Sequence, residues 1–112
     1  MSYAPFDVVV VPFPFSDRLA EKRRPAVVVS VPALEAHHGW VWLAMITSTH
    51  NADGYADVVV ADRTAAGLPA PSAVRAGKLA TVEPDRILRR IGSLAEADRR
   101  AVVRAIRSCA AF

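Results

Sequence analysis

The chain contains a single cysteine, Cys109, among its 112 residues. One thiol cannot form an internal disulfide, and no second cysteine stands at metal-ligand spacing from it, so we expect neither an oxidised scaffold nor a cysteine zinc site. No apolar run approaches the roughly 18 residues of a membrane span. No cationic start followed by an apolar stretch and a small-residue cleavage site marks an export signal. We therefore expect a soluble, cytoplasmic protein with no membrane-bound part.

Sequence motifs for cofactor chemistry are missing as well. The chain has no glycine-rich phosphate loop, no His-Glu-x-x-His pair and no nucleophile elbow. We therefore predict no metal and no organic cofactor. The net charge of +3 permits nucleic acid as a partner without requiring it. Lysine is scarce, with 2 residues against 12 arginines, which suits phosphate binding. Because 21 alanines accompany the arginines, codon usage in a GC-rich genome explains more of this bias.

Short β-branched runs dominate the first four fifths of the chain, and its length fits one domain over residues 1–112. In the first run, Phe6 to Val11, both alternating sets of residues are apolar, which predicts burial on both faces. Pro12 and Pro14 are expected to end this strand. Further strands are predicted over residues 26–31, 40–47, 55–61, 72–82 and 86–91.

The connections between these runs carry recognisable turn residues. Asn51 to Gly54 has hairpin chemistry, and Gly77 predicts a bulge within its strand. Asp62 is expected to cap a short turn that ends before Gly67, and Gly92 is expected to end the last strand.

A closing helix is predicted because Ser93 to Glu96 matches a capping box, in which the serine hydroxyl accepts from a backbone amide of the first turn. An apolar stripe that ends in Cys109 follows, so we expect a buried, inert thiol. Several short strands before one helix indicate a mainly β fold, a small curled sheet or barrel with a C-terminal helix. The residues expected to face outward on the helix are Asp98, Arg99, Arg100, Arg104 and Arg107.

Three consecutive cations, Lys22 to Arg24, stand before Pro25 and an apolar run. They are expected to end a long exposed loop over residues 15–24, with the strand starting where the charges stop. Pro25 restricts the backbone of Arg24, so its guanidinium would be held in place to bind a phosphate. The alternative is an ion pair with Asp17 or Glu21, which is the commoner role for a surface arginine.

Hydroxyl side chains gather at the end of the third predicted strand, at Thr47, Ser48 and Thr49, and His50 follows. A hydroxyl here could donate to a phosphate oxygen, and His50 could carry a proton near neutral pH. Each also has an ordinary structural role. Strand-end hydroxyls commonly bond the nearby backbone, and a histidine in a turn is usually solvated.

Two further basic pairs stand later in the chain. Arg75 and Lys78 could form a second basic patch in a segment of small residues. Arg89 and Arg90 would point to opposite faces of a regular strand, so at least one of them is expected to be structural.

Three aromatic side chains, Phe13, Trp40 and Trp42, could stack on nucleobases. The two tryptophans share one face of a predicted strand, so packing in the core is the favoured role.

With these segments in order, the sequence resembles the MazF/PemK family of toxins from bacterial toxin–antitoxin pairs. The Arg-Pro-apolar strand followed about twenty residues later by Ile-Thr-Ser is the more specific part of the resemblance. The matching stretches are residues 7–17, 22–30, 46–48, 72–81 and 91–94.

The resemblance implies an SH3-like barrel with a terminal helix, of the MazF/PemK/CcdB type, and a homodimer. It also implies metal-independent cleavage of single-stranded RNA at short sequences. In this reaction the ribose 2′-hydroxyl attacks the neighbouring phosphorus, leaving a cyclic phosphate and a free 5′-hydroxyl. A cognate antitoxin protein with an extended, often acidic tail would cover the RNA groove.

Carried over by position, Arg24 and Thr47 match the family's arginine before proline and its strand-end threonine, and are the predicted catalytic residues. Arg75 matches a basic position where relatives place an acid two residues later, but Gly77 stands there. Leu19 replaces a glutamate of many relatives. Proton transfer would fall to His50, to water, or to a loop carboxylate, Asp17 or Glu21. The predicted RNA-binding residues are Lys22, Arg23, Ser48, His50, Arg75 and Lys78.

Two other functions fit the same fold. One is a non-enzymatic poison of the CcdB type, which acts by binding a target protein. The other is a protein-binding barrel without toxicity. Cleavage of RNA in the presence of EDTA would separate the nuclease from both.

Overall fold

The structure, a computed structural model, describes residues 2–13 and 22–112. The predictions made for Asp17, Leu19 and Glu21 lie outside these residues, as does the side chain of Phe13. The strands are β1 (Asp7–Phe13), β2 (Lys22–Val28), β3 (Val41–Ser48), β4 (Asp57–Val59), β5 (Ser72–Val82) and β6 (Arg89–Ser93). The helices are α1 (Pro32–His38), α2 (Arg63–Ala66) and α3 (Glu96–Cys109), with 3₁₀ turns η1 (Thr49–Asn51) and η2 (Pro84–Arg86).

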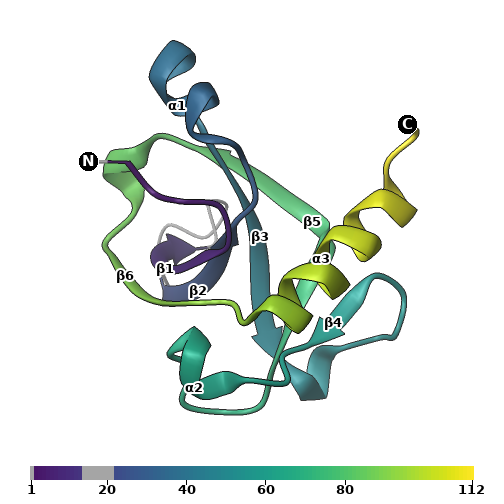
Figure 1. The fold of residues 1–112 in the computed structure, drawn as a ribbon. Helices are drawn as coiled ribbons and strands as arrows, with labels where there is room; N and C mark the ends of the chain where they lie inside the picture. The colour runs from purple at the N-terminus through teal and green to yellow at the C-terminus, as the bar shows by residue number, and fades with distance from the viewer. Residues whose placement is uncertain (1, 14–21) are drawn as a thin grey trace.

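The six described strands form one antiparallel sheet in the order β4-β5-β3-β2-β1-β6, and α3 follows the last strand (Figure 1). The predicted mainly β fold with a C-terminal helix is therefore confirmed. Within the described chain the edge strands β4 and β6 do not pair with each other, so the expected barrel is an open, curled sheet. No described helix has the length and apolar character that crossing a membrane requires.

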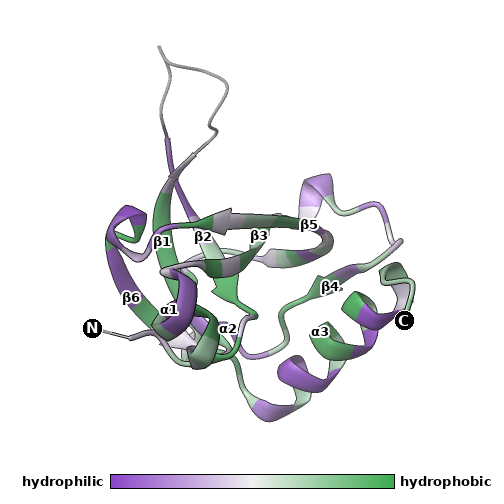
Figure 2. Ribbon diagram, turned by 90° about the horizontal axis from the view of Figure 1, so that it is seen from above, coloured by the Kyte–Doolittle hydropathy of each residue, from purple (hydrophilic) through white to green (hydrophobic). Residues whose placement is uncertain are grey.

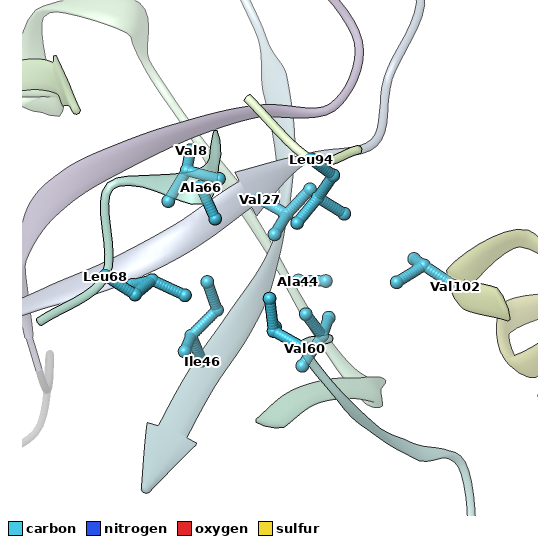
Figure 3. Packing of buried hydrophobic residues seen from close by; sticks show 10 residues of the cluster. Val8, Val27, Ala44, Ile46, Val60, Ala66, Leu68, Leu94 and Val102 are labelled. Atoms are coloured by element: carbon cyan, nitrogen blue, oxygen red, sulfur yellow. The ribbon is translucent and has the colours of Figure 1, made fainter. Parts of the chain in front are cut away.

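Strand β1 is buried on both faces, as its double apolar pattern predicts, because the sheet carries core clusters on its two sides. Val8 belongs to one cluster, with Val27 and Ala44 from the neighbouring strands. Val9 belongs to the other cluster, with Leu43. Figure 3 shows the first cluster, to which Leu94 and Val102 of the C-terminal region also belong. Figure 2 shows the matching amphipathic character of α3, whose apolar residues face the sheet.

The expected end of β1 at Pro12 is wrong, and so is the expected loop position of the cations. Strand β1 continues to Phe13 because residues Lys22 to Arg24 pair with it as the first part of β2. Val11 lies opposite Arg24, and Pro12 lies opposite Arg23. The three cations are thus part of a strand, where pairing on the β1 side fixes their backbone.

The turn chemistry is confirmed at two places. The Asp62 carboxylate accepts from the backbone N–H of Ala65 at 3.0 Å, and Gly67 ends α2 in the left-handed conformation. The bulge near Gly77 is also present, because Ala44 pairs with Leu79 while the next residue of β3 pairs with Arg75.

The expected hairpin at Asn51 to Gly54 is wrong. Thr49 to Asn51 form a 3₁₀ turn, and the following strand pairs with β5 instead of β3. Strand β6 also runs past Gly92 to Ser93, because Gly92 and Ser93 pair with Val8 and Asp7 of β1.

The start of α3 differs from the predicted capping box. Ser93 is held in β6, the helix begins at Glu96, and Ala95 is the N-cap residue without a side-chain bond. The Ser93 hydroxyl instead accepts from the guanidinium of Arg99 at 3.0 Å. The predicted burial of Cys109 is wrong, since this thiol is exposed near the helix end. Trp40 and Trp42 are each 46% exposed, so their predicted place in the core is wrong too.

Asp98 is the residue of α3 that departs most from its predicted outward position. Its side chain is buried and accepts from the backbone N–H groups of Ala61 and Asp62, with distances of 3.0 to 3.2 Å. This carboxylate ties α3 to the chain between β4 and α2. The helical period places Asp98 on the edge of the apolar stripe, and the two amides supply the partner that a buried charge needs.

Candidate functional site

Arg24 and Thr47 come together because β2 and β3 are neighbours in the sheet. Their antiparallel ladder ends at the pair Ala26 and Met45. Continuing that register by two residues along each strand brings Arg24 opposite Thr47, on the same face because side chains alternate. The ladder stops beside Pro25, whose nitrogen carries no hydrogen to extend it. The space at this end of the two strands is left open for the two side chains.

A pocket of about 340 Å³ lies where this face meets β5, and we call it the central pocket. Arg24 and Thr47 both line it, with the buried Met45 beside them. Among the described residues, no carboxylate lies within ion-pair distance of Arg24. The other lining residues are Ile46, Asn51, Arg75 and Lys78.

A second pocket of about 380 Å³ adjoins the first and shares Arg24 and Thr47 with it. Lys22 and Arg23 also line it, and we call it the cationic pocket. Ser48 contributes an exposed hydroxyl. The opposite wall consists of the segment 68–72, which leads into β5. Three consecutive cations of one strand therefore line the cationic pocket.

The hydroxyl of Thr47 has a side-chain partner that the sequence analysis did not identify. Its oxygen accepts from the Asn51 side-chain amide at 3.1 Å. Because the oxygen acts as an acceptor here, the hydroxyl hydrogen is directed elsewhere and can donate to another group. The sequence predicts a hairpin at Asn51, and this prediction hides the contact. The signal that could have revealed it is the spacing of four residues between Thr47 and Asn51, which a 3₁₀ turn connects.

Arg75 and Lys78 line the central pocket together, as their predicted basic patch requires, but Arg75 is not an isolated charge. Its Nε lies 3.6 Å from an oxygen of Asp57, and its Nη2 lies 3.7 Å from an oxygen of Asp53. The Asp57 side chain is only 4% exposed, against 64% for Asp53. A buried carboxylate beside a guanidinium fixes the direction of that guanidinium. Neither aspartate was among the predicted site residues.

Other predicted residues are not brought to these pockets. His50 is exposed in η1 and lines neither the central nor the cationic pocket. Arg90 has the predicted structural role, since its Nε donates to Asp7 at 2.9 Å. The described residues contain no group of three or more His, Cys, Asp or Glu side chains placed to hold a metal ion.

A family model described as PemK-like, MazF-like toxin of type II toxin-antitoxin system matches residues 4–109. Among solved structures, toxin MazF-mt6 of Mycobacterium tuberculosis is similar with a TM-score of 0.73 and 23% identity, covering 92% of this chain and 94% of that chain. No curated protein matches the chain.

Two further similar structures contain a second protein. A mycobacterial endoribonuclease in complex with its cognate antitoxin has a TM-score of 0.77 at 17% identity, covering 96% of this chain and 94% of that chain. A MazE-MazF structure from Deinococcus radiodurans has a TM-score of 0.76 at 19% identity, covering 96% and 95%. At these identities the likeness shows a shared fold.

Proposed function

The chain belongs to the PemK-like, MazF-like toxin family of type II toxin–antitoxin systems, and we propose that it is a metal-independent endoribonuclease that cuts single-stranded RNA at short sequences. The observation that carries this proposal is the shared position of Arg24 and Thr47, which line the same two pockets from neighbouring strands. A guanidinium and an alcohol within reach of one phosphodiester are the donors that phosphoryl chemistry needs.

In the proposed reaction the ribose 2′-oxygen forms a bond to the adjacent phosphorus while the bond from phosphorus to the 5′-oxygen breaks. Arg24 donates to a non-bridging oxygen and stabilises the charge that develops there. Thr47 donates to a phosphate oxygen, since the oxygen of its hydroxyl already accepts from Asn51. The products are a cyclic phosphate and a free 5′-hydroxyl.

The proton of the attacking 2′-hydroxyl needs an acceptor, and a guanidinium is too weak a base for this role. His50 is exposed and does not line the central pocket. Water, Asp17 and Glu21 are the remaining candidates, and both carboxylates lie outside the described residues. The proton that the leaving 5′-oxygen takes up comes from Arg24 or from water.

The bound RNA would follow the concave surface formed by the two pockets. Lys22 and Arg23 bind phosphates on one side of the scissile linkage, with Ser48 as a further donor. Arg75 and Lys78 bind on the other side, in the central pocket. The ion pairs with Asp53 and Asp57 hold the guanidinium of Arg75 in place, so its role is to position a phosphate already bound.

The similar structures of an endoribonuclease with its cognate antitoxin and of MazE-MazF support a protein partner for this chain as well. We expect an antitoxin with an acidic segment, because the cationic pocket gathers Lys22, Arg23 and Arg24 on one surface. We also expect a homodimer in the cytoplasm.

The first experiment incubates the purified protein with single-stranded RNA in the presence of EDTA. Cleavage is expected to continue, with 5′-hydroxyl ends on the downstream fragments. Arg24→Ala is expected to lower the cleavage rate by about 10²- to 10³-fold, the usual effect of removing one donor to a developing oxyanion. Arg104→Ala is the matched control, because Arg104 is exposed on α3 and lines neither pocket.

The second experiment distinguishes the hydrogen bond that the Thr47 hydroxyl donates from the packing of the Thr47 side chain. Thr47→Val removes the donor and should slow cleavage by about tenfold, the factor for one hydrogen bond of about 1.4 kcal/mol. Thr47→Ser keeps the donor and should retain most of the rate.

An absence of cleavage by the wild-type protein would overturn the nuclease proposal. Expression of this chain alone in a bacterial host then identifies the class. Growth arrest would favour the non-enzymatic poison, and normal growth would favour the protein-binding module.

A further inference from the structure

A third pocket of about 340 Å³ adjoins the central pocket on the side of β4, and we call it the aspartate pocket. Arg75 and Lys78 line both, so the two spaces are continuous across these side chains. Asp53, Tyr55 and Asp57 form the opposite wall. Its volume falls within the range of about 300 to 1,000 Å³ that is typical of small-molecule sites.

The loop that carries the two aspartates is held by its own hydrogen bonds. The N–H of Asp53 donates to the Asp57 carboxylate at 3.0 Å, and the N–H of Tyr55 donates to the Asp53 carboxylate at 3.1 Å. Ala56 has a positive φ of 60°, which is unusual for a residue with a side chain. Its carbonyl accepts from the Ala76 N–H at 2.9 Å, which holds this turn against β5. The pocket wall is therefore ordered before any ligand binds.

The groups around the aspartate pocket differ in kind from those of the cationic pocket. Carboxylate oxygens of Asp53 and Asp57 accept hydrogen bonds and repel phosphate, whereas Arg75 and Lys78 donate. Tyr55 is 71% exposed, and its hydroxyl donates to the carbonyl of Ser108 at 3.4 Å. A ring anchored at one end and open on its face is suited to stacking. Donors, acceptors and an aromatic face together match a nucleobase.

Gly77 leaves the pocket open on the side of α3. A Cβ built at Gly77 would meet the Cys109 sulfur at 3.6 Å and the Ala56 Cβ at 4.0 Å, which are ordinary contacts. The glycine contributes no side chain to the pocket, and the acidic groups come from the facing loop instead. Cys109 therefore lies next to Gly77, which lines the pocket.

We propose that the aspartate pocket binds the nucleobase next to the scissile phosphate and selects bases that carry an exocyclic amine, namely cytosine, adenine or guanine. This inference rests on the proposed nuclease function for the position of the phosphate. The amine donates to the Asp53 carboxylate, as carboxylates accept from the cytosine amine in nucleic-acid recognition. Uracil has no exocyclic amine: two carbonyl oxygens, which the same carboxylate repels, flank its single ring N–H.

The test by cleavage uses a single-stranded RNA library of random sequence, with fragment 5′ ends mapped by sequencing. At one position beside the cut, wild-type protein is expected to prefer amine-bearing bases over uracil by about tenfold or more, the effect of one good base-edge contact. Asp53→Asn keeps the carbonyl oxygen that bonds the Tyr55 amide and replaces the other carboxylate oxygen with a donor. This variant should cut at uracil in that position. Asp85→Asn, an exposed residue outside the three pockets, should leave the profile unchanged.

A cleavage profile that is the same for wild type and Asp53→Asn would overturn the inference while leaving the nuclease function in place. The same conclusion follows if wild type accepts uracil equally at every position beside the cut.

A binding readout does not depend on cleavage, because Cys109 is the only cysteine of the chain and lies beside the pocket. The probes are short RNAs with every 2′-hydroxyl methylated, which removes the nucleophile. An oligonucleotide of cytosine and adenine is expected to slow alkylation of Cys109 by iodoacetamide several-fold more than an oligonucleotide of uracil. Asp53→Asn should abolish this difference.

The two readouts distinguish the failures of the two proposals. Selective protection of Cys109 without any cleavage would overturn the nuclease function and support the base pocket. Cleavage with equal or absent protection by the two RNAs would overturn the base pocket. Protection by an acidic peptide but by neither RNA would also overturn it, in favour of a protein ligand.

Discussion

The carboxylate of Asp98 joins α3 to the segment between β4 and α2, and we expect Asp98→Ala to lower the free energy of unfolding by about 3 kcal/mol. Two backbone donors lose their partner in this variant, the N–H groups of Ala61 and Asp62. Hydrogen bonds to a charged group contribute about 1.5 to 3 kcal/mol each, which gives an upper range of about 3 to 6 kcal/mol. Ala61 and Asp62 are exposed, so water replaces part of this loss.

Asp98 also lies in the first turn of α3, where a negative charge interacts favourably with the helix dipole by about 0.5 kcal/mol. Asp98→Asn keeps the shape and one acceptor oxygen of the side chain but loses its charge. It should therefore lower the free energy of unfolding by about half as much as Asp98→Ala does. The matched control is Asp85→Ala, since Asp85 is exposed and its removal should change stability by less than about 0.5 kcal/mol.

Urea unfolding measures the effect. With an m-value of about 1 to 3 kcal/mol/M for a small protein, a loss of 3 kcal/mol lowers the midpoint by about 1 M or more. The order of midpoints should be Asp85→Ala highest, then Asp98→Asn, then Asp98→Ala. If Asp98→Ala and Asp85→Ala unfold at the same urea concentration, the buried carboxylate is not what holds the helix to the sheet.

Four other substitutions have defined outcomes. Gly92→Ala places a Cβ 2.4 Å from the backbone of α2, so unfolding experiments should show a loss of about 3 kcal/mol or more, whereas Gly77→Ala has room and should change little. Arg90→Ala leaves the largely buried Asp7 carboxylate without its guanidinium and should cost about 1 kcal/mol, since Arg90 itself is half exposed. Lys22→Ala should reduce the slope of log affinity for single-stranded RNA against log salt by about 0.7, the value for one lost phosphate contact, and an unchanged slope would remove Lys22 from the RNA path.

Several parts of the fold were predictable because their causes are local. The double apolar pattern of Val8 to Val11 predicts burial on both faces, and the two core clusters provide it. Asp62 and Gly67 delimit a one-turn helix through a side-chain cap and a left-handed residue, both of which depend on neighbours in the chain.

The candidate site was predictable in its residue types and only partly in its geometry. Arg24 and Thr47 were identified by resemblance to a family, and the sheet brings them into one pocket. Asn51 and Asp53 were not identified, because residues 51–54 predict a hairpin that the structure does not contain. Asp57 was not identified because it lies within a predicted strand, where the sequence does not show which residue it faces.

The sequence alone determined the approximate position of most strands and the turn from Asp62 to Gly67, because periodicity and backbone preference act over a few residues. Tertiary structure alone decided which distant groups meet. Asp98 accepts from an amide 37 positions away, and Arg75 acquires its carboxylates only after β4 pairs with β5 instead of β3. Such contacts depend on strand order and register, which are set by the free energy of the whole packed sheet and not by any segment of it.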